Sequence, residues 1–487
     1  MHAHSVAMTQ SVHDTLSSHL LRHDGQEDIC LATYAVSTGA TRITRLLHEV
    51  HLPTDGDRQV HGNATIQGSY VLRIAALAAQ RGHGVAILHS HPGSRGWQLL
   101  SGPDADAESS YASLVEHVTG LPLVGLTLAG DSTWSARAWN DGRPGWAGSV
   151  RRVGTTLTVS WNDQLVPPAR PEESQVRTIS AWGPDRHRDI TRLRVLVVGA
   201  GSVGLDVIQR LAATGIVEIG IMDFDRVHVV NRDRMVGATR RDARLHRRKI
   251  DVAARLARMA ATAFGFKAHR HHTSICSPEG LAAALDYDVI FSCVDRPWPR
   301  AVLNSIAYAD LIPVIDGGIA IDALDIGGMR GATRRTQSAT SGVACLACSG
   351  QINMLEVTLE MNGDLDDPGY IRRSGREPVS GRPNVAALSS GVSASQLELF
   401  VSLVAHPAGR GVPGPLRFML APHHLEHMPA ASQPYCEAEQ KTGLGDARTD
   451  MCRATGPWTS QEGDQLNWFR RRFHDHIDIF IERLMNR

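Results

Sequence analysis

Two histidines two positions apart, followed by a carboxylate, form the first candidate site. Residues 84–92 read Gly-Val-Ala-Ile-Leu-His-Ser-His-Pro, which is typical of a strand that its final proline ends. On such a strand His89 and His91 project from the same face, so their imidazoles can share one metal ion. Ser101-Gly-Pro-Asp104 then opens a helix-like segment, from which Asp104 can supply a third ligand. The fourth position would be left for a water molecule, whose pKa the metal would lower toward neutrality.

Each of these motifs also has an ordinary structural explanation. Ser-x-x-Asp before a helix is a capping pattern, and His-x-His is common on exposed strands. Together they resemble the JAB/MPN (JAMM) metalloprotease family over about residues 20–140, whose signature is an upstream Glu, then His-x-His-Pro, then Ser-x-x-Asp. The resemblance implies a zinc-dependent isopeptidase-like hydrolase domain of the α/β class. It makes His89, His91 and Asp104 zinc ligands, and it makes Ser101 a donor to the developing oxyanion.

The resemblance also implies a general base, which in that family is a Glu at the start of the first strand. Glu27, just before the apolar residues 29–32, fits this position best, and Glu49 is the second candidate. Twelve residues separate His91 from Asp104, where the family usually has ten, so Asp106 stays open as an alternative third ligand.

A glycine-rich turn forms the second candidate site. Residues 193–198 are a nearly continuous apolar strand of the kind buried in a parallel sheet, and they lead into Gly199-Ala-Gly201-Ser-Val-Gly204. Glycines allow a phosphate to approach the backbone, and the N-terminus of the helix that follows offers N–H donors. Asp223, about 20 residues further on, is placed for a ribose hydroxyl. These features alone also fit an NAD-dependent oxidoreductase.

The residues after this turn favour ATP over a dinucleotide. They include Asp223-Phe-Asp225-Arg-Val, Asn231-Arg-Asp-Arg234, Lys249 and Cys-Val-Asp295. This ordered set resembles the ThiF/MoeB/E1 superfamily of activating enzymes from about residue 174 to 425, with its pattern Asp-x-Asp-x-Val, Asn-x-x-Arg, Lys and Asp. The resemblance implies a doubly wound Rossmann-like domain. It would be a transferase that adenylates the C-terminus of a ubiquitin-like protein.

The expected chemistry explains these residue types. Attack of a carboxylate on the α-phosphate expels pyrophosphate, so cations must hold the triphosphate and an anionic residue must hold Mg²⁺. By the resemblance, Arg234 and Lys249 hold the phosphates, Asp295 holds Mg²⁺ and Asp223 binds the ribose. Asp225 and Asn231 are expected to line the same pocket.

The first helix of this domain also matches that superfamily. Residues 176–179, with Trp182 and Gly183, resemble the helix that opens the family's domain. The counterpart of Arg177 in the family reaches the nucleotide of a neighbouring subunit, which implies a homodimer.

Cysteines provide a third candidate site. Cys345-x-x-Cys348 fits one half of the four-cysteine zinc site of that superfamily, and the chain offers Cys436 and Cys452 for the other half. Four thiolates from distant segments would close one tetrahedral site and tie the tail to the domain; free thiols are the alternative for the later pair.

A thioester-forming cysteine is not indicated by the sequence. Cys30, Cys276 and Cys293 lie in or next to expected core strands, where a buried thiol is usually inert, and residues 349–400 contain no cysteine. Adenylation is therefore the expected activity, and thioester transfer lacks support unless Cys436 or Cys452 is free.

The elements that position these residues fall into two main domains, because 487 residues are too many for one ordinary core. The predicted division is a JAB/MPN-like domain at 1–150, a linker at 151–174, a ThiF/E1-like domain at 175–430 and a cysteine-containing, helical tail at 431–487. The Pro-rich, charged residues 166–173 mark the linker, and helical spacing over residues 466–484 predicts a docking helix. Further strands are expected at 126–128, 217–222, 288–292 and 312–315, with helices at 250–261 and 300–308.

Composition excludes some classes of partner. Fifty basic and fifty acidic residues give no reason to expect nucleic acid or an anionic membrane, and no apolar run approaches the roughly 18 residues of a membrane span. The N-terminus lacks the apolar core of a signal peptide, so a cytoplasmic protein is expected.

The modules together predict a protein that activates a ubiquitin-like modifier with ATP and Mg²⁺ and that processes or removes it with Zn²⁺. An E2-like protein is the further partner expected in a conjugation system. The first alternative is activation of a sulfur-carrier protein for cofactor or metabolite synthesis. The remaining alternatives are an NAD-dependent oxidoreductase and a catalytically degenerate binding scaffold.

Overall fold

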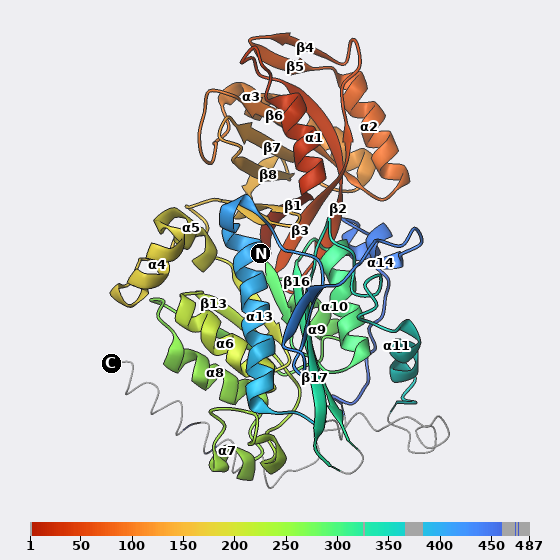
Figure 1. Ribbon diagram of the computed structural model, residues 1–487. Coiled ribbons are helices and arrows are strands. Elements are labelled where there is room, and N and C mark those ends of the chain that lie inside the picture. The colour runs from red at the N-terminus through yellow and green to blue at the C-terminus, as the bar shows by residue number, and fades with distance from the viewer. Residues whose placement is uncertain (1, 325–326, 366–382, 460–472, 474–475, 477–487) are drawn as a thin grey trace.

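Two large sheets, each covered by helices, make up the protein. The computed structural model describes residues 2–324, 327–365, 383–459, 473 and 476 (Figure 1). Strands up to Trp161 form the first sheet, and strands from Arg194 onward form the second. The mixed α/β class predicted from the sequence is confirmed.

Within the described residues, nine strands form the first sheet, in the order β11-β10-β1-β3-β2-β6-β7-β8-β9. β1 pairs in parallel with β3 and β10, and β6 pairs in parallel with β7. The other neighbouring strands are antiparallel. β4 (Arg58–His61) and β5 (Asn63–Ile66) form a separate hairpin. The strands of the sheet are β1 (Ala3–Thr9), β2 (Ile29–Thr38), β3 (Arg42–His51), β6 (Gly84–His91), β7 (Val124–Ala129), β8 (Trp134–Asn140), β9 (Arg143–Trp146), β10 (Ser149–Val153) and β11 (Leu157–Trp161).

Helices cover both faces of this sheet. α1 (Gln10–Leu20) buries Leu16 and Leu20 in a cluster with Trp134. α2 (Gly68–Gln80) and α3 (Gly102–Thr119) bury a second cluster, which includes Tyr70 and Val115. Because apolar residues lie on both sides of β2 and β6, these strands are almost wholly buried. The ends of β2 and β6 are therefore held firmly in place.

The second sheet has eight strands among the described residues, in the order β14-β13-β12-β15-β16-β17-β18-β19. The neighbours from β14 to β16 are parallel, and those from β16 to β19 are antiparallel. The strands are β12 (Arg194–Val198), β13 (Glu218–Met222), β14 (Lys267–His271), β15 (Val289–Ser292), β16 (Val314–Ala323), β17 (Met329–Ala339), β18 (Leu416–Met419) and β19 (His424–His427).

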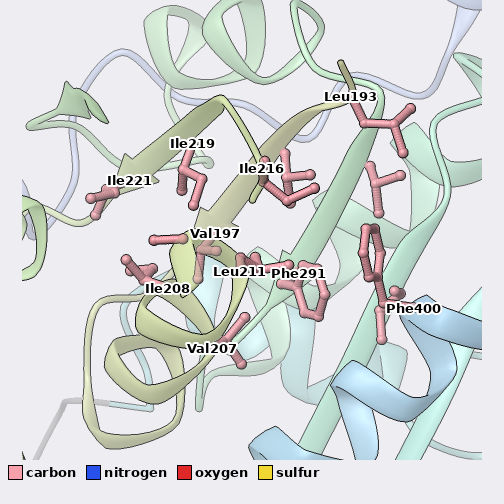
Figure 2. Close-up of a cluster of buried hydrophobic side chains, with 14 of the residues drawn as sticks. Leu193, Val197, Val207, Ile208, Leu211, Ile216, Ile219, Ile221, Phe291 and Phe400 are labelled. Carbon is pink, nitrogen blue, oxygen red and sulfur yellow. The ribbon is translucent and has the colours of Figure 1, made fainter. Parts of the chain in front are cut away.

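Helices also lie on both faces of the second sheet. Figure 2 shows one core, in which Val197 of β12, Ile221 of β13, Leu211 of α6 and Phe400 of α13 contribute to a single buried cluster. The other face buries α10 around Ile306. The helices of this part are α4 (Val176–Trp182), α5 (Pro184–Thr191), α6 (Ser202–Thr214), α7 (Arg240–Arg244), α8 (Lys249–Ala260), α9 (Pro278–Ala284), α10 (Pro297–Ala309), α11 (Met354–Met361), α13 (Ala386–Ala405), α14 (Glu437–Gln440) and the 3-10 helices η1 (Glu173–Gln175), η2 (Val229–Asn231), η4 (Pro407–Gly409) and η5 (Gly445–Ala447).

The strongly apolar segments were predicted correctly, apart from shifts of one or two residues at most ends. β7, β12, β13, β15 and the start of β16 occupy the predicted strands, and α8 and α10 occupy the predicted helices. The linker differs, because β10 and β11 continue the first sheet through residues 149–161. Within the predicted linker at 151–174, residues 154–156 and 162–172 lie outside any helix or strand. The predicted docking helix at 466–484 lies almost entirely outside the described residues.

One helix corrects an expectation from composition. Among the described residues, α13 alone is long and apolar enough to meet the length and hydropathy of a membrane span, with a mean hydropathy of 1.3 over its best window. Half of that window is buried inside the protein, where Phe400 and Leu403 belong to the core of the second sheet. Several serines, a glutamine and a glutamate interrupt its apolar residues, so it does not read as one apolar run. α13 is a core helix here.

Buried charges join the two sheets. The side chain of Arg42, the first residue of β3, donates to Asp288 Oδ1 at 2.6 Å, and Arg151 of β10 donates to the same oxygen at 3.3 Å. Thr41 donates to Asp286 Oδ2 at 2.6 Å. All four ionic residues are at most 6% exposed. Ion pairs removed from water need close partners, so these contacts fix one half of the chain against the other.

Candidate functional site

The glycine turn leads from β12 into α6. Gly199 has φ +93°, and a Cβ there would lie 2.5 Å from the carbonyl oxygen of Cys293. A Cβ on Gly204 would lie 1.8 Å from the carbonyl oxygen of Gly199, so α6 packs directly on the turn. Gly201 faces open space and borders a cavity, and as the N-cap residue it gives α6 no side-chain cap. The first N–H groups of α6 are thus available to an anion.

This cavity has a volume of about 1260 Å³ and lies at the carboxyl ends of the parallel strands. Most of the predicted nucleotide-site residues line it. They are Gly199, Gly201, Asp223, Asp225, Asn231, Arg234, Lys249 and Asp295. Gly204 is not part of the lining and serves the packing of α6.

Three carboxylates surround one lysine in the cavity. Lys249 Nζ donates to Asp225 Oδ2 at 2.8 Å. Burial lowers the pKa of Lys249, but Asp223, Asp225 and Asp295 together raise it above its ordinary value, so the ammonium group stays charged. Asp223 accepts hydrogen bonds from the backbone N–H groups of Ala200 and Asp225, each at 2.7 Å. Its enclosed position raises the pKa of the Asp223 carboxyl, and Lys249 opposes the rise.

Asn231 and Arg234 lie at another wall of the cavity, on and after η2. Asn231 Oδ1 accepts the backbone N–H of His228 at 2.9 Å, which caps η2. Arg234 donates to the carbonyl oxygen of Val230 at 2.7 Å and to Asp233 at 2.9 Å. Its guanidinium is 31% exposed, so it is accessible to an anionic ligand. Cations, N–H donors and carboxylates of this kind fit a nucleoside triphosphate with Mg²⁺.

Other cavity residues were missed by the sequence reasoning. Loop residues 273–276 follow β14, Trp298 lies in the first turn of α10, and Arg335 comes from β17. Trp458 lies in the segment after η5. No local motif marks these residues, because they reach the cavity only through the order of strands in the sheet and the return of the C-terminal segment.

The two histidines and the carboxylate of the first site come together at the end of β6. One ligand atom from each of His89, His91 and Asp104 lies within 4.8 Å of the others. Asp104 Oδ2 is 3.7 Å from His89 Nε2 and 3.6 Å from His91 Nε2. Burial, helped by the nearby Arg137 guanidinium, lowers the pKa of His89 to about 3, so its imidazole is the neutral form that binds a metal.

Glu27 and Ser101, the residues predicted as base and hydroxyl donor, border this cluster. Glu27 Oε1 lies 3.9 Å from His91 Nε2, and burial raises the pKa of the Glu27 carboxyl. The Ser101 hydroxyl donates to Asp104 Oδ2 at 2.6 Å, and Ser101 also accepts the Asp104 N–H as the N-cap of α3. The capping explanation and the site explanation therefore both describe this pair.

The alternatives left open by the sequence lie elsewhere. Asp106 is exposed on α3 and is not part of the cluster, and Glu49 forms an ion pair with Arg81. The geometry thus brings Asp104 and Glu27 to the histidines.

A buried polar network lies behind His89. Thr127 Oγ1 is 3.3 Å from His89 Nε2 and accepts a hydrogen bond from Arg137 at 2.7 Å. Arg137 forms an ion pair with Glu108, to which Trp139 also donates at 2.7 Å. This network fixes the position of β7 and β8 around the imidazole.

Three cysteines form the third cluster, with a glutamate in place of the fourth. Cys345, Cys348, Cys436 and Glu439 each offer a ligand atom within 4.8 Å of the others. Cys345 Sγ and Cys436 Sγ are 3.4 Å apart, and Glu439 accepts the Cys345 N–H at 2.8 Å. Three thiolates and a carboxylate fit a tetrahedral Zn²⁺ site.

Cys452 lies apart from this cluster. Its Sγ is 3.9 Å from the carbonyl oxygen of Ile275, next to the nucleotide cavity. The predicted ligand set therefore differs by one member from the arrangement in the structure, since Glu439 stands where Cys452 was expected. Burial raises the pKa of the thiols of Cys30, Cys276 and Cys293, which keeps them protonated.

Comparisons with known proteins match the part of the chain that contains the second sheet. Residues 173–371 match the model of the ThiF family. The chain is 25% identical over 139 residues to the adenylyltransferase and sulfurtransferase MOCS3 of Caenorhabditis briggsae, which covers 28% of this chain and 34% of that protein. It is 28% identical over 142 residues to the sulfur carrier protein adenylyltransferase of Thermus thermophilus, which covers 28% of this chain and 49% of that protein.

The chain thus spans about a third to a half of the length of these relatives. The crystal structure of E. coli MccB with ATP has a TM-score of 0.43 and 15% identity, and the match covers 55% of this chain and 74% of that one. The C-terminal part of the chain contains a ThiF family adenylyltransferase domain, which confirms the resemblance for that part.

Proposed function

We propose that the second half of the chain uses ATP to adenylate the C-terminus of a ubiquitin-like or sulfur-carrier protein. The observation that carries the proposal is the charged Lys249 among three carboxylates, in the same cavity as the uncapped N-terminus of α6. The names of the relatives support a sulfur carrier as one class of substrate. A carrier of either class presents the same chemical group, a C-terminal carboxylate.

The proposed reaction joins that carboxylate to AMP. An oxygen of the carrier's terminal carboxylate bonds to the α-phosphorus of ATP as the bond to the pyrophosphate leaving group breaks. The products are an acyl-adenylate and pyrophosphate. Lys249 and Arg234 bind the phosphate oxygens, and the first N–H groups of α6 donate to them. Asp223 orients the ribose, and Asp295 holds Mg²⁺, which neutralises phosphate charge when bound.

An ATP–pyrophosphate exchange assay tests this proposal. With a carrier protein present, the wild-type protein should incorporate labelled pyrophosphate into ATP, and D295A should lose at least about tenfold of that rate because the Mg²⁺ ligand is gone. D322A, on exposed Asp322 outside the cavity, is the matched control. Full exchange in D295A would show that Asp295 does not hold the metal. No exchange with any carrier would defeat the proposed activity.

We further propose that the first half of the chain is a JAB/MPN-like, Zn²⁺-dependent peptidase that cleaves at the C-terminus of the same modifier. The convergence of His89, His91 and Asp104, with Glu27 beside them, supports it. These three side chains would hold Zn²⁺, which lowers the pKa of a water molecule when bound. Glu27 would accept a proton from the attacking water and pass it to the leaving amine, and the Ser101 hydroxyl would donate to the oxyanion.

Cleavage of a modifier fusion tests the peptidase. H91A should abolish cleavage and Zn²⁺ binding at this site, whereas exchange of pyrophosphate should continue. D106N, on the same helix but outside the cluster, should cleave normally. Equal loss of both activities in H91A would contradict the separate use of the two sites.

Partners beyond the modifier follow from the same proposal. An E2-like protein is required only if the modifier is conjugated. Arg177 lies on α4, and its family role at a neighbouring nucleotide supports a homodimer as the proposed assembly. The raised thiol pKa values of the buried cysteines give thioester transfer no support.

A further inference from the structure

A segment from the C-terminal part of the chain forms one wall of the nucleotide cavity. Residues 455–458 line the cavity, although they lie far from the glycine turn in sequence. Two hydrogen bonds hold the segment in place. The Trp298 indole N–H donates to the carbonyl oxygen of Met451 at 2.9 Å, and the Arg453 N–H donates to the carbonyl oxygen of Cys276 at 2.9 Å. Both partners belong to elements that line the cavity themselves.

An aromatic group gathers at this wall. The ring centroid of Trp458 lies 5.6 Å from that of Trp298 and 6.3 Å from that of Phe224. Phe224 directly follows Asp223, the residue placed for the ribose. Trp298 is 4% exposed, whereas Trp458 is only partly buried and borders the cavity. One aromatic ring of this group is therefore accessible to a ligand in the cavity.

The position of the ribose determines which part of the nucleotide lies next to the Trp458 ring. In a doubly wound sheet the phosphates lie at the glycine turn and the ribose at the end of the next strand, so the base lies beyond it, toward the strand after that. Here that direction leads from Asp223 of the β13 end to residues 273–276 after β14. Phe224 follows Asp223 in this direction, and Trp458 packs against Phe224 and into the same cluster as Ile275 and Cys276.

We propose that Trp458 contacts the purine base of the bound nucleotide and closes the base subsite from outside. The proposal rests on the nucleotide site proposed above and extends it to a residue outside the ThiF match at 173–371. Stacking of a base on an aromatic side chain strengthens binding by roughly 5- to 150-fold, so Trp458 is a substantial determinant of nucleotide affinity.

Calorimetric titration of the full-length protein with ATP, and separately with inorganic tripolyphosphate, tests this assignment. W458A should weaken ATP binding roughly tenfold and leave tripolyphosphate binding unchanged, because tripolyphosphate has no base. W458F should restore most of the ATP affinity. Y435A is the matched control, since Tyr435 lies in the same part of the chain but is 92% exposed and outside the cavity.

Equal loss of ATP and tripolyphosphate binding in W458A, or unchanged ATP binding, would overturn the assignment. If W458A does not fold, the fluorescence of the wild-type protein and of W458F is compared instead. ATP should quench the part of the wild-type emission that W458F lacks. Equal quenching in the two proteins would overturn the assignment. A wild-type protein that binds neither ligand would instead defeat the nucleotide site itself.

Discussion

Single residues set the chemistry of each cluster, and Glu439 shows how one residue alters a candidate metal site. Its carboxylate takes the place that the sequence assigned to Cys452, close to Cys345 and Cys436. Three thiolates and one carboxylate carry the same net charge as four thiolates. Zn²⁺ binds oxygen ligands as well as sulfur ligands.

Replacement of these residues distinguishes the two ligand sets. C345S should lose one equivalent of Zn²⁺ per chain. E439A should weaken Zn²⁺ binding by at least about tenfold, because one of the four ligands is removed. C452S should keep the full zinc content, because its Sγ lies beside Ile275 instead. Metal analysis after dialysis measures this. Zinc loss in C452S equal to that in C345S would show that the predicted four-cysteine set is correct.

The residues that sequence reasoning could place are those in short, ordered motifs. His89 and His91 share a face of one strand, and Ser101 and Asp104 share one helix turn, so spacing alone relates the members of each pair. Glu439 and Trp458 reach their sites through long returns of the chain, which no spacing rule encodes. The choice between Asp104 and Asp106 also needed the structure, because the loop after His91 is longer than is usual in the JAB/MPN family.

At the scale of elements, the start of α7 illustrates how caps and charges hold the segment between Arg234 and Lys249. Asp242 is buried, receives the Thr239 N–H at 2.8 Å and accepts two hydrogen bonds from Arg255 at 2.9 Å each. Burial raises the pKa of Asp242, but the hydrogen bonds from Arg255 and Thr239 outweigh it and bring the pKa to about 2.

This shift predicts a pH dependence of stability. The folded-state pKa lies below the unfolded value of about 3.9, so the stabilisation is complete above about pH 4 and is lost as the pH falls through 2. D242N should therefore reduce the free energy of unfolding by about 2 kcal/mol at pH 7. The difference from wild type should shrink near pH 2.5. Urea denaturation at both pH values measures it, with D322N as an exposed control. A difference that stays constant with pH would contradict the assigned pKa.

Elements were predictable where an apolar run was unbroken. The buried strands β12, β13 and β15 are short apolar segments next to glycine or aspartate, and they were located to within one or two residues. β10 and β11 were assigned to a linker, because their alternating Ser, Arg and Thr residues are polar. Arg151 of β10 is nevertheless fully buried and donates to Asp288 of the other half of the chain, which a local pattern does not reveal.

At the scale of the whole molecule, Asp288 joins the two halves. It accepts hydrogen bonds from the Arg42 and Arg151 side chains and from the Arg194 N–H. Burial lowers the pKa of Arg151 to about 9, and the Asp288 carboxylate opposes that shift. Removal of this carboxylate would leave two buried guanidinium groups without their anionic partner.

D288A should therefore lower the free energy of unfolding by about 3 kcal/mol, whereas D322A should change it by less than about 0.5 kcal/mol. The control breaks an ion pair with Arg330 in which both side chains are exposed to solvent. Chemical denaturation followed by fluorescence measures both variants. Equal stability of D288A and D322A would mean that water reaches Arg42 and Arg151 in solution.

The same contacts bear on how the chain folds as the ribosome makes it. Residues 27 to 139, which carry His89, Asp104 and the network behind them, emerge first and can assemble while synthesis continues. Arg42 and Arg151 must stay hydrated until residue 288 follows, well over a hundred residues later. Translation speed across that interval therefore sets how long the two arginines of the nascent first half stay exposed without their carboxylate partner.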